Sequence, residues 1–416
     1  MKRAEAERMD AEDAIGWLRD HFVFDDPGLI YLDGNSLGRL PKATIAAVNE
    51  AMRAGWGSRL VRAWHEWIDV GQRVGDHLGK KLLGAAPGQV AVSDSTSVNL
   101  YKLATAALDT RPGRRVILST SDNFPTDRYI LEGLAAARGL ELRLLNPGAD
   151  GGIGVDALKA ALGLDVALVS LSHVSYLSGA IEDVPAITRA ARYAGALVLW
   201  DLSHSAGAVP IELDSWGVDL AVGCTYKYLN AGPGAPAFLY VRHSLQTRLR
   251  QPIWGWWGQR EQFAMGPAYD PARSIARFLA GTPPVLSLLP IQVGVDVLAE
   301  AGVERLRDKG VALTELIVRL WEAWLEPLGF TLSSPRDPAR RGAHVSLGHA
   351  EAYRVSQALI EECKVIPDFR PPNVVRLGPA PAYTRFVDVW DAMDRLRKVM
   401  DARAYERFDP RPGRVT

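Results

Sequence analysis

Two residues near the middle of the chain, an acid and a lysine, have side chains that could do chemistry together. Asp201 follows the apolar run of residues 196–200, and Lys227 follows a second buried-strand pattern, residues 219–224. Unbroken apolar runs of this length predict parallel strands that are covered on both faces. Ligands of open α/β sheets bind outside the carboxyl ends of such strands, so we expect both residues to face one crevice. The alternative is that Asp201 caps a turn and Lys227 lies on the surface.

A lysine paired with an acid in this way is typical of enzymes that use pyridoxal phosphate. The lysine binds the cofactor as a Schiff base, and the acid contacts the pyridinium nitrogen. The ring draws electrons from a substrate while its nitrogen is protonated, and a nearby anion favours that charged form. We expect Lys227 and Asp201 to fill these two roles. Tyr226 directly precedes the lysine, and its phenol could donate to the phosphate and supply a proton during turnover.

The sequence around both residues resembles that of kynureninases, which are pyridoxal-phosphate enzymes of aminotransferase fold type I. The resemblance implies hydrolysis of the Cβ–Cγ bond of L-kynurenine, 3-hydroxykynurenine or a ring-substituted analogue. The products would be L-alanine and an anthranilate, in tryptophan catabolism or a related biosynthetic route. The matching stretches follow the family's order over roughly residues 30 to 390, and they lie at 32–38, 124–127, 201–207, 225–232, 254–258, 281–284 and 376–378.

Hydroxyl residues stand directly before a predicted helix over residues 98–108. A helix start offers free backbone N–H groups and the positive end of the helix dipole, which together bind a phosphate. The alternative is that these hydroxyls only cap the helix. An aromatic ring placed after a strand can lie flat on the pyridine ring. The resemblance assigns the phosphate to Thr96 and Ser97 and the stacking to Phe124, and it places Asp127 and His204 close to the cofactor.

Two stretches rich in aromatic residues and proline, 254–258 and 277–284, follow the last predicted strand of the sheet. In the family such loops cross to the partner subunit, where the residues that match Trp256 and Thr282 donate to the phosphate. The resemblance therefore implies a homodimer with the active site at the subunit interface. If these residues only form a hydrophobic plug, the dimer loses this support.

Arg376 is the one cation on the predicted apolar strand 374–377. The planar fork of an arginine suits two-point binding of a carboxylate, although an arginine on a strand is usually solvated or ion-paired. Its position in the family implies that it binds the α-carboxylate of the substrate. The resemblance also places Asn35, Ser36 and Trp64 beside the substrate. The alternatives are that residues 34–38 only reverse the chain and that Trp64 belongs to a buried helix face.

The length of 416 residues predicts a large and a small domain in an α/β fold. We expect a large cofactor-binding domain with a mixed, mostly parallel sheet over residues 56–290 and a smaller C-terminal α+β domain over 291–416. Residues 1–55 are expected to form a helix, over 4–21, and an arm that pack with the small domain. The 48 basic and 48 acidic residues balance, so the overall charge favours neither nucleic acid nor a membrane surface.

The two cysteines, Cys224 and Cys363, and an N-terminus without an apolar core favour a cytoplasmic enzyme. No apolar run reaches membrane-spanning length, and no metal site is expected. A cysteine desulfurase or an aminotransferase of the same fold is the first rival, but a desulfurase needs a nucleophilic cysteine on a mobile loop. Cys224 is expected in a buried strand and Cys363 at a helix end. A non-catalytic scaffold is the second rival, and the presence of both the acid and the lysine argues against it.

Overall fold

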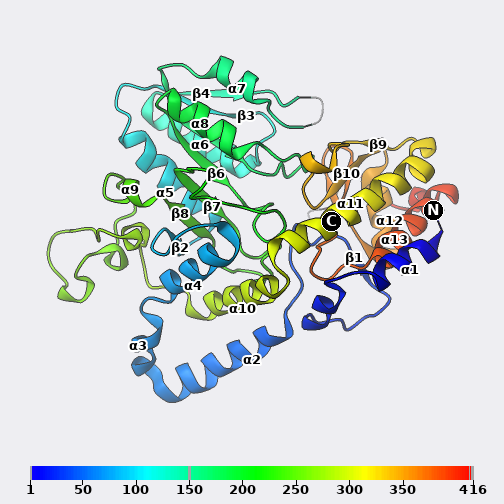
Figure 1. Cartoon of the computed structure of the whole chain (residues 1–416), viewed down its shortest axis with the longest axis horizontal. Coiled ribbons are helices and arrows are strands. Elements are labelled where there is room, and N and C mark those ends of the chain that lie inside the picture. Colours follow the sequence, from blue (N-terminus) through cyan, green and yellow to red (C-terminus); the bar gives the residue numbers. More distant parts are fainter. Residues whose placement is uncertain (1, 149–150, 412, 414–416) are drawn as a thin grey trace.

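The computed structural model describes residues 2–148, 151–411 and 413, and its larger part is built on a seven-stranded sheet (Figure 1). The strand order is β2-β8-β7-β6-β5-β3-β4. The strands from β7 to β4 are parallel, whereas β8 is antiparallel to both of its neighbours. This mixed, mostly parallel sheet confirms the expected α/β class. The strands are β2 (Val90–Val92), β3 (Val116–Thr120), β4 (Glu141–Leu145), β5 (Val166–Ser172), β6 (Leu197–Asp201), β7 (Leu220–Gly223) and β8 (Phe238–Val241).

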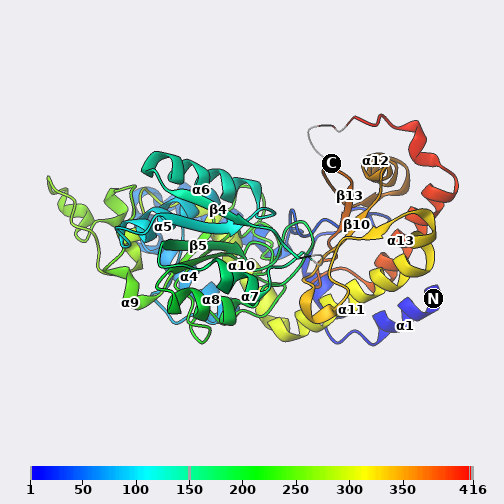
Figure 2. The ribbon, with the colours of Figure 1, turned by 90° about the horizontal axis from the view of Figure 1, so that it is seen from above.

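Helices cover both faces of this sheet, which is why every position of β6, β7 and β8 is buried (Figure 2). Val198 and Trp200 of β6 point to one face, and Leu197 and Leu199 point to the other. Each fully buried side chain of this size contributes roughly 1.5–3 kcal/mol to folding. On the first face lie α4 (Val70–Leu78), α7 (Val155–Ala161), α8 (Val184–Tyr193) and α10 (Val285–Ala301), and on the second lie α5 (Thr96–Asp109) and α6 (Pro125–Arg138).

A second hydrophobic core lies at the other end of the molecule, around a four-stranded antiparallel sheet with the order β12-β13-β10-β9. Helices pack on this sheet, so the smaller part has the expected α+β character (Figure 1). Its elements are α11 (Val303–Leu320), β9 (Thr331–Leu332), β10 (Val345–Gly348), α12 (Ala352–Cys363), β12 (Asp368–Arg370), β13 (Val374–Leu377) and α13 (Phe386–Asp401).

The N-terminal segment contacts both cores. The helix expected over residues 4–21 is wrong as a single element, because α1 (Arg3–Ala11) ends and a separate 3-10 helix (Gly16–His21) follows. The chain turns at Asp13, whose carboxylate accepts the backbone N–H of Ile15 at 3.0 Å and pairs with Lys309 at 2.7 Å. α1 then packs in the second core, while Ile15 belongs to the core of the larger sheet.

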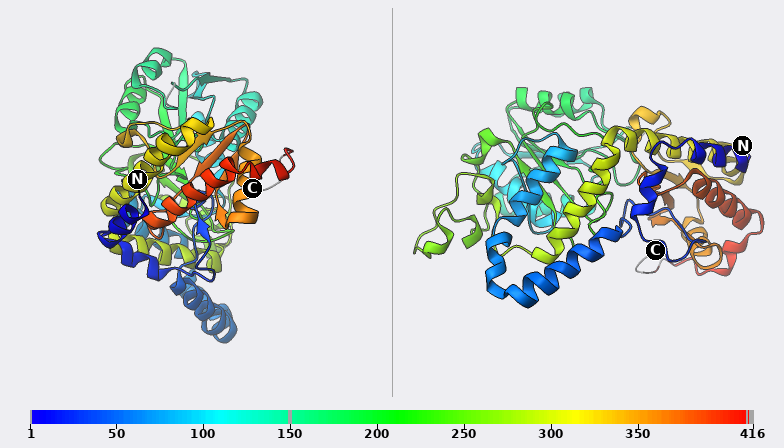
Figure 3. Two further views of the ribbon diagram at one scale, coloured as in Figure 1. Left: turned by 90° about the vertical axis from the view of Figure 1, so that its right-hand side faces the viewer. Right: turned by 60° about the horizontal axis from the view of Figure 1, so that its bottom comes forward.

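A helical rod follows and projects from the body of the molecule (Figure 3). It consists of α2 (Lys42–Glu50) and the π-helical residues Ala51–Arg59. Before it, β1 (Ile30–Tyr31) pairs in parallel with β11 (Val365–Ile366), which ties the arm to the smaller part. The domain boundaries near residues 55 and 290 stay our prediction.

Helices α10 and α11 connect the two cores, because α10 packs under the larger sheet and α11 packs in the second core. Gly302, with φ +82°, makes the turn between them. In the described part of the chain no single helix is long and apolar enough to cross a membrane. The pair Val285–Ala301 and Val303–Leu328, bent by 80°, meets those two criteria only when taken together.

Candidate active site

Asp201 and Lys227 line the same cavity, at the carboxyl ends of the parallel strands. Asp201 is the last residue of β6, and Lys227 lies four residues beyond β7. Because β6 and β7 are adjacent and parallel, their carboxyl ends present both side chains to one space. We call this space the central cavity. The other residues predicted from the sequence that line it are Thr96, Ser97, Phe124, Asp127, His204 and Tyr226.

Two carboxyl groups meet on one side of the central cavity. Asp127, in the first turn of α6, is buried and shares a side-chain hydrogen bond with Asp201. Burial raises the pKa of Asp127 well above its usual value, and the negative charge of Asp201 raises it further. The raised pKa favours the protonated form of Asp127, and with it a single negative charge on the pair. Asp201 also accepts the backbone N–H of Ser203 at 2.7 Å, so it stabilises a turn as well.

A neutral histidine holds the lysine amine. Lys227 Nζ lies 2.8 Å from Nε2 of His204, which is buried. Burial, and secondly the charge of Lys227, hold the pKa of His204 well below its usual value. The ring is therefore uncharged, Nε2 accepts from the ammonium, and the ring proton sits on Nδ1. The lysine amine also lies 5.9 Å from the ring centroid of Phe124, so it faces the cavity rather than the solvent.

A buried amide fixes the aromatic residue that precedes α6. The side-chain oxygen of Asn123 accepts the N–H of Phe124 and the hydroxyl of Ser172, both at 2.8 Å. Its amide group donates to Ser119 Oγ at 3.1 Å. Pro125 then opens the helix, where its missing N–H costs nothing. This network sets the direction of the Phe124 ring and brings Asp127 onto the cavity side of α6.

The start of α5 forms the opposite end of the central cavity. Ser95 caps the helix, because its hydroxyl oxygen accepts the N–H of Val98 at 3.3 Å. Thr96 and Ser97 follow and line the cavity. The capping alternative therefore applies to Ser95, and the two predicted hydroxyl residues remain available to a ligand. The free N–H groups and the positive dipole end make this place suitable for an anion.

The donor set of the central cavity fits pyridoxal phosphate. An anion site, an amine, an aromatic ring and a carboxyl pair surround one space, which matches the phosphate, the aldehyde, the ring face and the ring nitrogen of that cofactor. Among the described residues, Asp127 Oδ2 and His204 Nδ1 are buried without a hydrogen-bond partner. Buried polar atoms are normally paired, so a polar ligand belongs against them.

Arg376, Asn35 and Ser36, the predicted substrate residues, come together beside the central cavity, and their role towards the substrate stays a prediction. Arg376 is 1% exposed and donates to the backbone oxygen of Tyr176 at 2.6 Å and to Ser36 Oγ at 3.0 Å. With its amide oxygen turned towards the guanidinium, Asn35 accepts from Arg376 Nε at 2.8 Å. Tyr176 itself lines the cavity. The ion-paired alternative also applies, since Asp368 lies 2.6 Å from Arg376 Nη2.

Sequence reasoning missed Asp368 and Arg370, which belong to the same cluster. Asp368 on β12 is directly opposite Arg376 on β13. Arg370 Nε donates to Asp368 at 2.7 Å, and its Nη2 lies 3.4 Å from Ser36 Oγ. The available signal was the spacing of two charged residues, two positions apart on one short strand, which places them on the same side.

Three residues predicted from the sequence lie elsewhere in this chain. Trp64 packs edge-on against Trp67 and at a tilt against Trp257, with ring centroids 5.8 Å apart in each pair. Trp256 is 37% exposed, and Thr282 borders a separate small hollow. In the described residues, these three do not line the central cavity of their own chain. Their functional roles stay a prediction.

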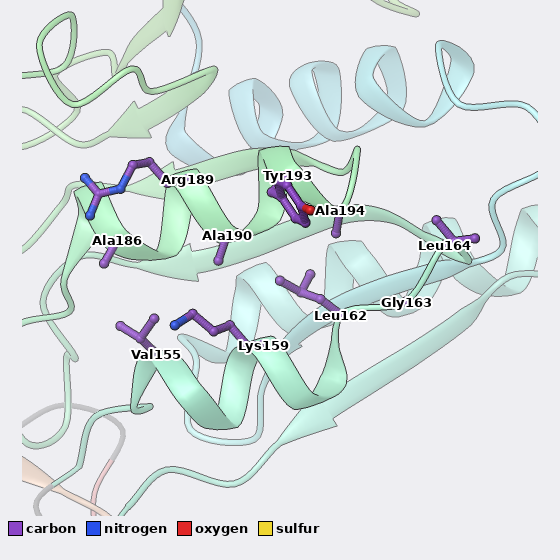
Figure 4. A pocket seen from close by; sticks show the side chains of 10 residues that line it. All are labelled: Val155, Lys159, Leu162, Gly163, Leu164, Ala186, Arg189, Ala190, Tyr193 and Ala194. Atoms are coloured by element: carbon purple, nitrogen blue, oxygen red, sulfur yellow. The ribbon is translucent and has the colours of Figure 1, made fainter.

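A larger hollow, of about 820 Å³, lies between α7 and α8, away from this chemistry (Figure 4). Its lining is mainly apolar, and its charged side chains are Lys159 and Arg189. Tyr193 at its edge is 98% exposed. Figure 4 shows these side chains spread along two helices rather than converging on one point, so size alone does not make this hollow a catalytic site.

Comparison with known proteins places the chain in a family. The family model for the kynureninase C-terminal domain matches residues 306–396. The kynureninase of Burkholderia pseudomallei (strain 1106a) is 45% identical over 411 residues, which are 97% of this chain and 96% of that protein. The kynureninase of Pseudomonas fluorescens is 44% identical over 405 residues, 95% of each chain. The chain belongs to the kynureninase family.

Solved structures with lower identity show the same fold. The apo cysteine desulfurase of Thermococcus onnurineus NA1 has a TM-score of 0.80 at 18% identity and covers 90% of this chain and 95% of its own. The cysteine desulfurase CsdA of Escherichia coli has a TM-score of 0.80 at 16% identity, with 94% and 98% covered. The likeness confirms the expected fold type I. This kynureninase-family chain thus shares its scaffold with enzymes of other activities, and only its site separates it from them.

Proposed function

We propose that this chain uses pyridoxal phosphate to hydrolyse the Cβ–Cγ bond of L-kynurenine, or of a 3-hydroxy or ring-substituted relative. One water is consumed: its hydroxyl joins the carbonyl carbon to give anthranilate, and its hydrogen completes the methyl group of L-alanine. The observation that carries the proposal is the meeting of Asp201, Asp127 and Lys227 in one cavity of a kynureninase-family chain.

Different residues of the central cavity are assigned to different parts of the cofactor. Pyridoxal phosphate, when bound, supplies an electron sink for the α- and β-carbons of the substrate. Thr96 and Ser97 at the start of α5 would hold the phosphate, and Phe124 would cover the ring. Asp201 would contact the ring nitrogen, where a negative charge favours the protonated ring. Asp127, whose pKa is raised, would lie beside Asp201 as its hydrogen-bond partner.

Lys227 and Tyr226 move the protons. With the cofactor and substrate bound, the Lys227 amine would be the group that takes the substrate's Cα proton and later returns one. Neutral His204 keeps that amine in the cavity through the 2.8 Å hydrogen bond. Burial raises the pKa of Tyr226, so its phenol stays protonated and can supply a proton at Cβ when alanine forms. Positioned acid–base groups typically contribute about two to four orders of magnitude in rate.

Arg376 and the loop that carries Ser36 position the substrate. The guanidinium is held on several sides by the Tyr176 carbonyl, Asn35 and Asp368, so its direction is set before the substrate arrives. We assign the α-carboxylate to Arg376 together with the Ser36 hydroxyl. Such prior fixing lowers the entropy cost of binding.

We also propose a homodimer whose active sites lie at the subunit interface. The segment 254–270 belongs to the light-green region that projects at the left of Figures 1 and 2. It includes Trp256, Phe263 (62% exposed) and Met265 (68% exposed). Apolar side chains exposed close together in one segment support a contact surface there. Trp256 and Thr282 would then donate to the phosphate in the partner's cavity, and Trp64 would form part of an aromatic wall for the substrate.

The rival desulfurase finds little support in the two cysteines. Cys224 lies one position past the end of β7 rather than in the strand as expected, but it is buried, and burial raises the pKa of its thiol. Cys363 ends α12, and partial burial raises its thiol pKa as well. Neither is a reactive thiolate on a loop. Both are free rather than disulfide-bonded, which supports the proposed cytoplasmic location.

One experiment separates these activities. The purified protein, loaded with pyridoxal phosphate, is incubated with L-kynurenine and, in parallel, with L-cysteine. We expect anthranilate fluorescence from the first mixture and no sulfide from the second. Sulfide without anthranilate would replace the proposal by the desulfurase, and neither product would favour the scaffold. The 3-hydroxy and ring-methylated analogues, measured beside kynurenine, rank the substrates, because a few atoms of the pocket decide such preferences.

A further inference from the structure

A buried lysine lies behind the start of α5. The side chain of Lys102 is fully buried, and its ammonium binds the carboxylate of Asp94 and the backbone oxygen of Phe278, the latter at 2.8 Å. None of these three residues lines the central cavity. A buried ion pair gains little net stability, because removing two charges from water offsets their attraction. Its value lies instead in the geometry that it imposes.

The first partner of Lys102 controls the turn into α5. Asp94 has φ +53°, a left-handed conformation that non-glycine residues rarely adopt. Its backbone oxygen accepts the N–H of Ala237 at 2.8 Å, and its side chain is held by the buried ammonium. Ser95, the helix cap, follows directly. The ammonium thus determines where the free N–H groups and hydroxyls of the anion site begin.

The second partner controls the segment that leads to Thr282. Phe278 ends a 3-10 helix, Ile275–Phe278, and its carbonyl is fixed by the ammonium. Ala280, two positions on, accepts the backbone N–H of Trp257 at 3.1 Å. Trp257 is the neighbour of Trp256, so the two stretches predicted to reach the partner's phosphate are tied to each other and to this one buried charge.

We propose that Lys102 is a positioning residue for the cofactor phosphate, which sets the anion site of its own subunit and the loop that serves the partner's site. This inference rests on the proposed function and on the proposed homodimer. Asp94 offsets the charge of the ammonium, so Lys102 acts through the position of the α5 turn rather than by direct attraction. Binding of the cofactor then depends on Lys102 only when the phosphate is present.

The test compares pyridoxal phosphate with pyridoxal, which has the same ring and no phosphate. Lys102→Met keeps the length of the side chain and removes its charge. Dissociation constants of both compounds from the apoprotein are measured by absorbance titration. We expect the affinity for pyridoxal phosphate to fall at least about tenfold, the size of one lost charge-assisted hydrogen bond, and the affinity for pyridoxal to stay within about twofold.

Lys309→Met is the matched control. Lys309 is also buried and pairs with the buried Asp13 at 2.7 Å, but it lies on α11, away from the cavity. The same chemical change there should leave both affinities unchanged. If Lys102→Met does not fold, Asp94→Asn tests the same link, because the Asp94 side chain is 31% exposed and asparagine tolerates the left-handed conformation.

Two outcomes overturn the inference: an equal loss of both affinities, or an unchanged affinity for pyridoxal phosphate in the variant that folds. The binding comparison does not depend on turnover. A wild type that binds pyridoxal phosphate but releases no anthranilate would therefore refute the proposed function and still leave the role of Lys102 open to this measurement.

Discussion

At the scale of single residues, the most informative feature is the proton that Asp127 keeps beside Asp201. If the pair carries one negative charge and Asp127 is its neutral member, an asparagine at position 127 resembles the protonated carboxyl group. An asparagine at position 201 instead removes the negative charge that favours the protonated ring nitrogen. We expect Asp201→Asn to lower kcat by about two to four orders of magnitude and Asp127→Asn to lower it by less than about tenfold.

Steady-state kinetics of both variants, saturated with cofactor, check this assignment. Asp127→Ala is the useful companion, because it removes the hydrogen bond as well as the proton and should be slower than Asp127→Asn. If Asp127→Asn lowered kcat as much as Asp201→Asn, the negative charge of the pair would not reside on Asp201 alone.

A second carboxyl group with a raised pKa is Asp33, in the loop that carries Asn35 and Ser36. Burial, and next the charge of Asp368, raise the pKa of Asp33 to about 6. Because the folded pKa lies above the unfolded one, the contribution of Asp33 to stability is present in acid and is lost as the pH rises through about 6. Asp33→Asn cannot ionise, so its gain over the wild type should be small near pH 4 and grow to about 2–3 kcal/mol above pH 7.

Urea unfolding midpoints of the two apoproteins, measured from pH 4.5 to pH 8, give this difference directly. We expect the stability gain of Asp33→Asn to grow as the pH rises. A gain that shrinks with rising pH, or that does not change, would contradict a raised pKa of Asp33.

At the scale of elements, the loop of residues 33–38 is a structural neighbour of the lysine loop and more than a chain reversal. The backbone N–H of Gly38 donates to the backbone carbonyl oxygen of Tyr226 at 2.8 Å. A Cβ at Gly38 would lie 2.3 Å from the backbone oxygen of Lys227. Gly38→Ala must therefore displace the backbone that carries both catalytic side chains. We expect kcat to fall at least about tenfold and stability to fall by about 1–3 kcal/mol.

Gly133→Ala supplies the control for the added methyl group. Gly133 lies inside α6, and no atom of the described residues is within 4 Å of the Cβ that it would gain. Alanine is favoured over glycine in a helix by about 0.5–1 kcal/mol, so this variant should be slightly more stable and fully active. Equal kinetics for the two variants would indicate that the contact at Gly38 does not constrain Lys227.

At the scale of the whole molecule, the question is whether one subunit completes the site of the other. Trp256 lies outside its own central cavity, whereas Lys227 lies inside it. If the loops cross, Lys227→Ala and Trp256→Ala inactivate different halves of one composite site. Mixing the two inactive variants and letting their subunits exchange should restore activity, because half of the dimers become mixed and each has one intact site, about a quarter of all sites.

Anthranilate release before and after subunit exchange measures this recovery, and sedimentation confirms that the species are dimers. Lys227→Ala alone, taken through the same exchange step, gives the baseline rate of anthranilate release. Because it lacks the lysine, it should also lack the colour of the lysine-bound cofactor. A mixture that stays inactive while Trp256→Ala alone is impaired would mean that Trp256 acts within its own subunit or through folding.

The sequence by itself determined the sheet and the meeting of Asp201 with Lys227. Strands buried on both faces are apolar at nearly every position, so residues 196–200 and 220–224 are recognisable without coordinates. The carboxyl ends of adjacent parallel strands necessarily share an edge, so two polar residues placed there must be neighbours. The motif resemblance added the remaining cavity residues through their order in the chain.

Only the tertiary structure decided the features that depend on distance and burial between remote segments. The contact of Asp127 with Asp201 that raises the pKa of Asp127, the pairing of Arg376 with Asp368, and the hydrogen bond from Lys102 to the Phe278 carbonyl each join different elements. The helix expected over residues 4–21 was interrupted for the same reason, because Asp13 finds its partner on α11. Local pattern fixes which element a residue joins, whereas the charge and freedom of a side chain depend on what the fold packs against it.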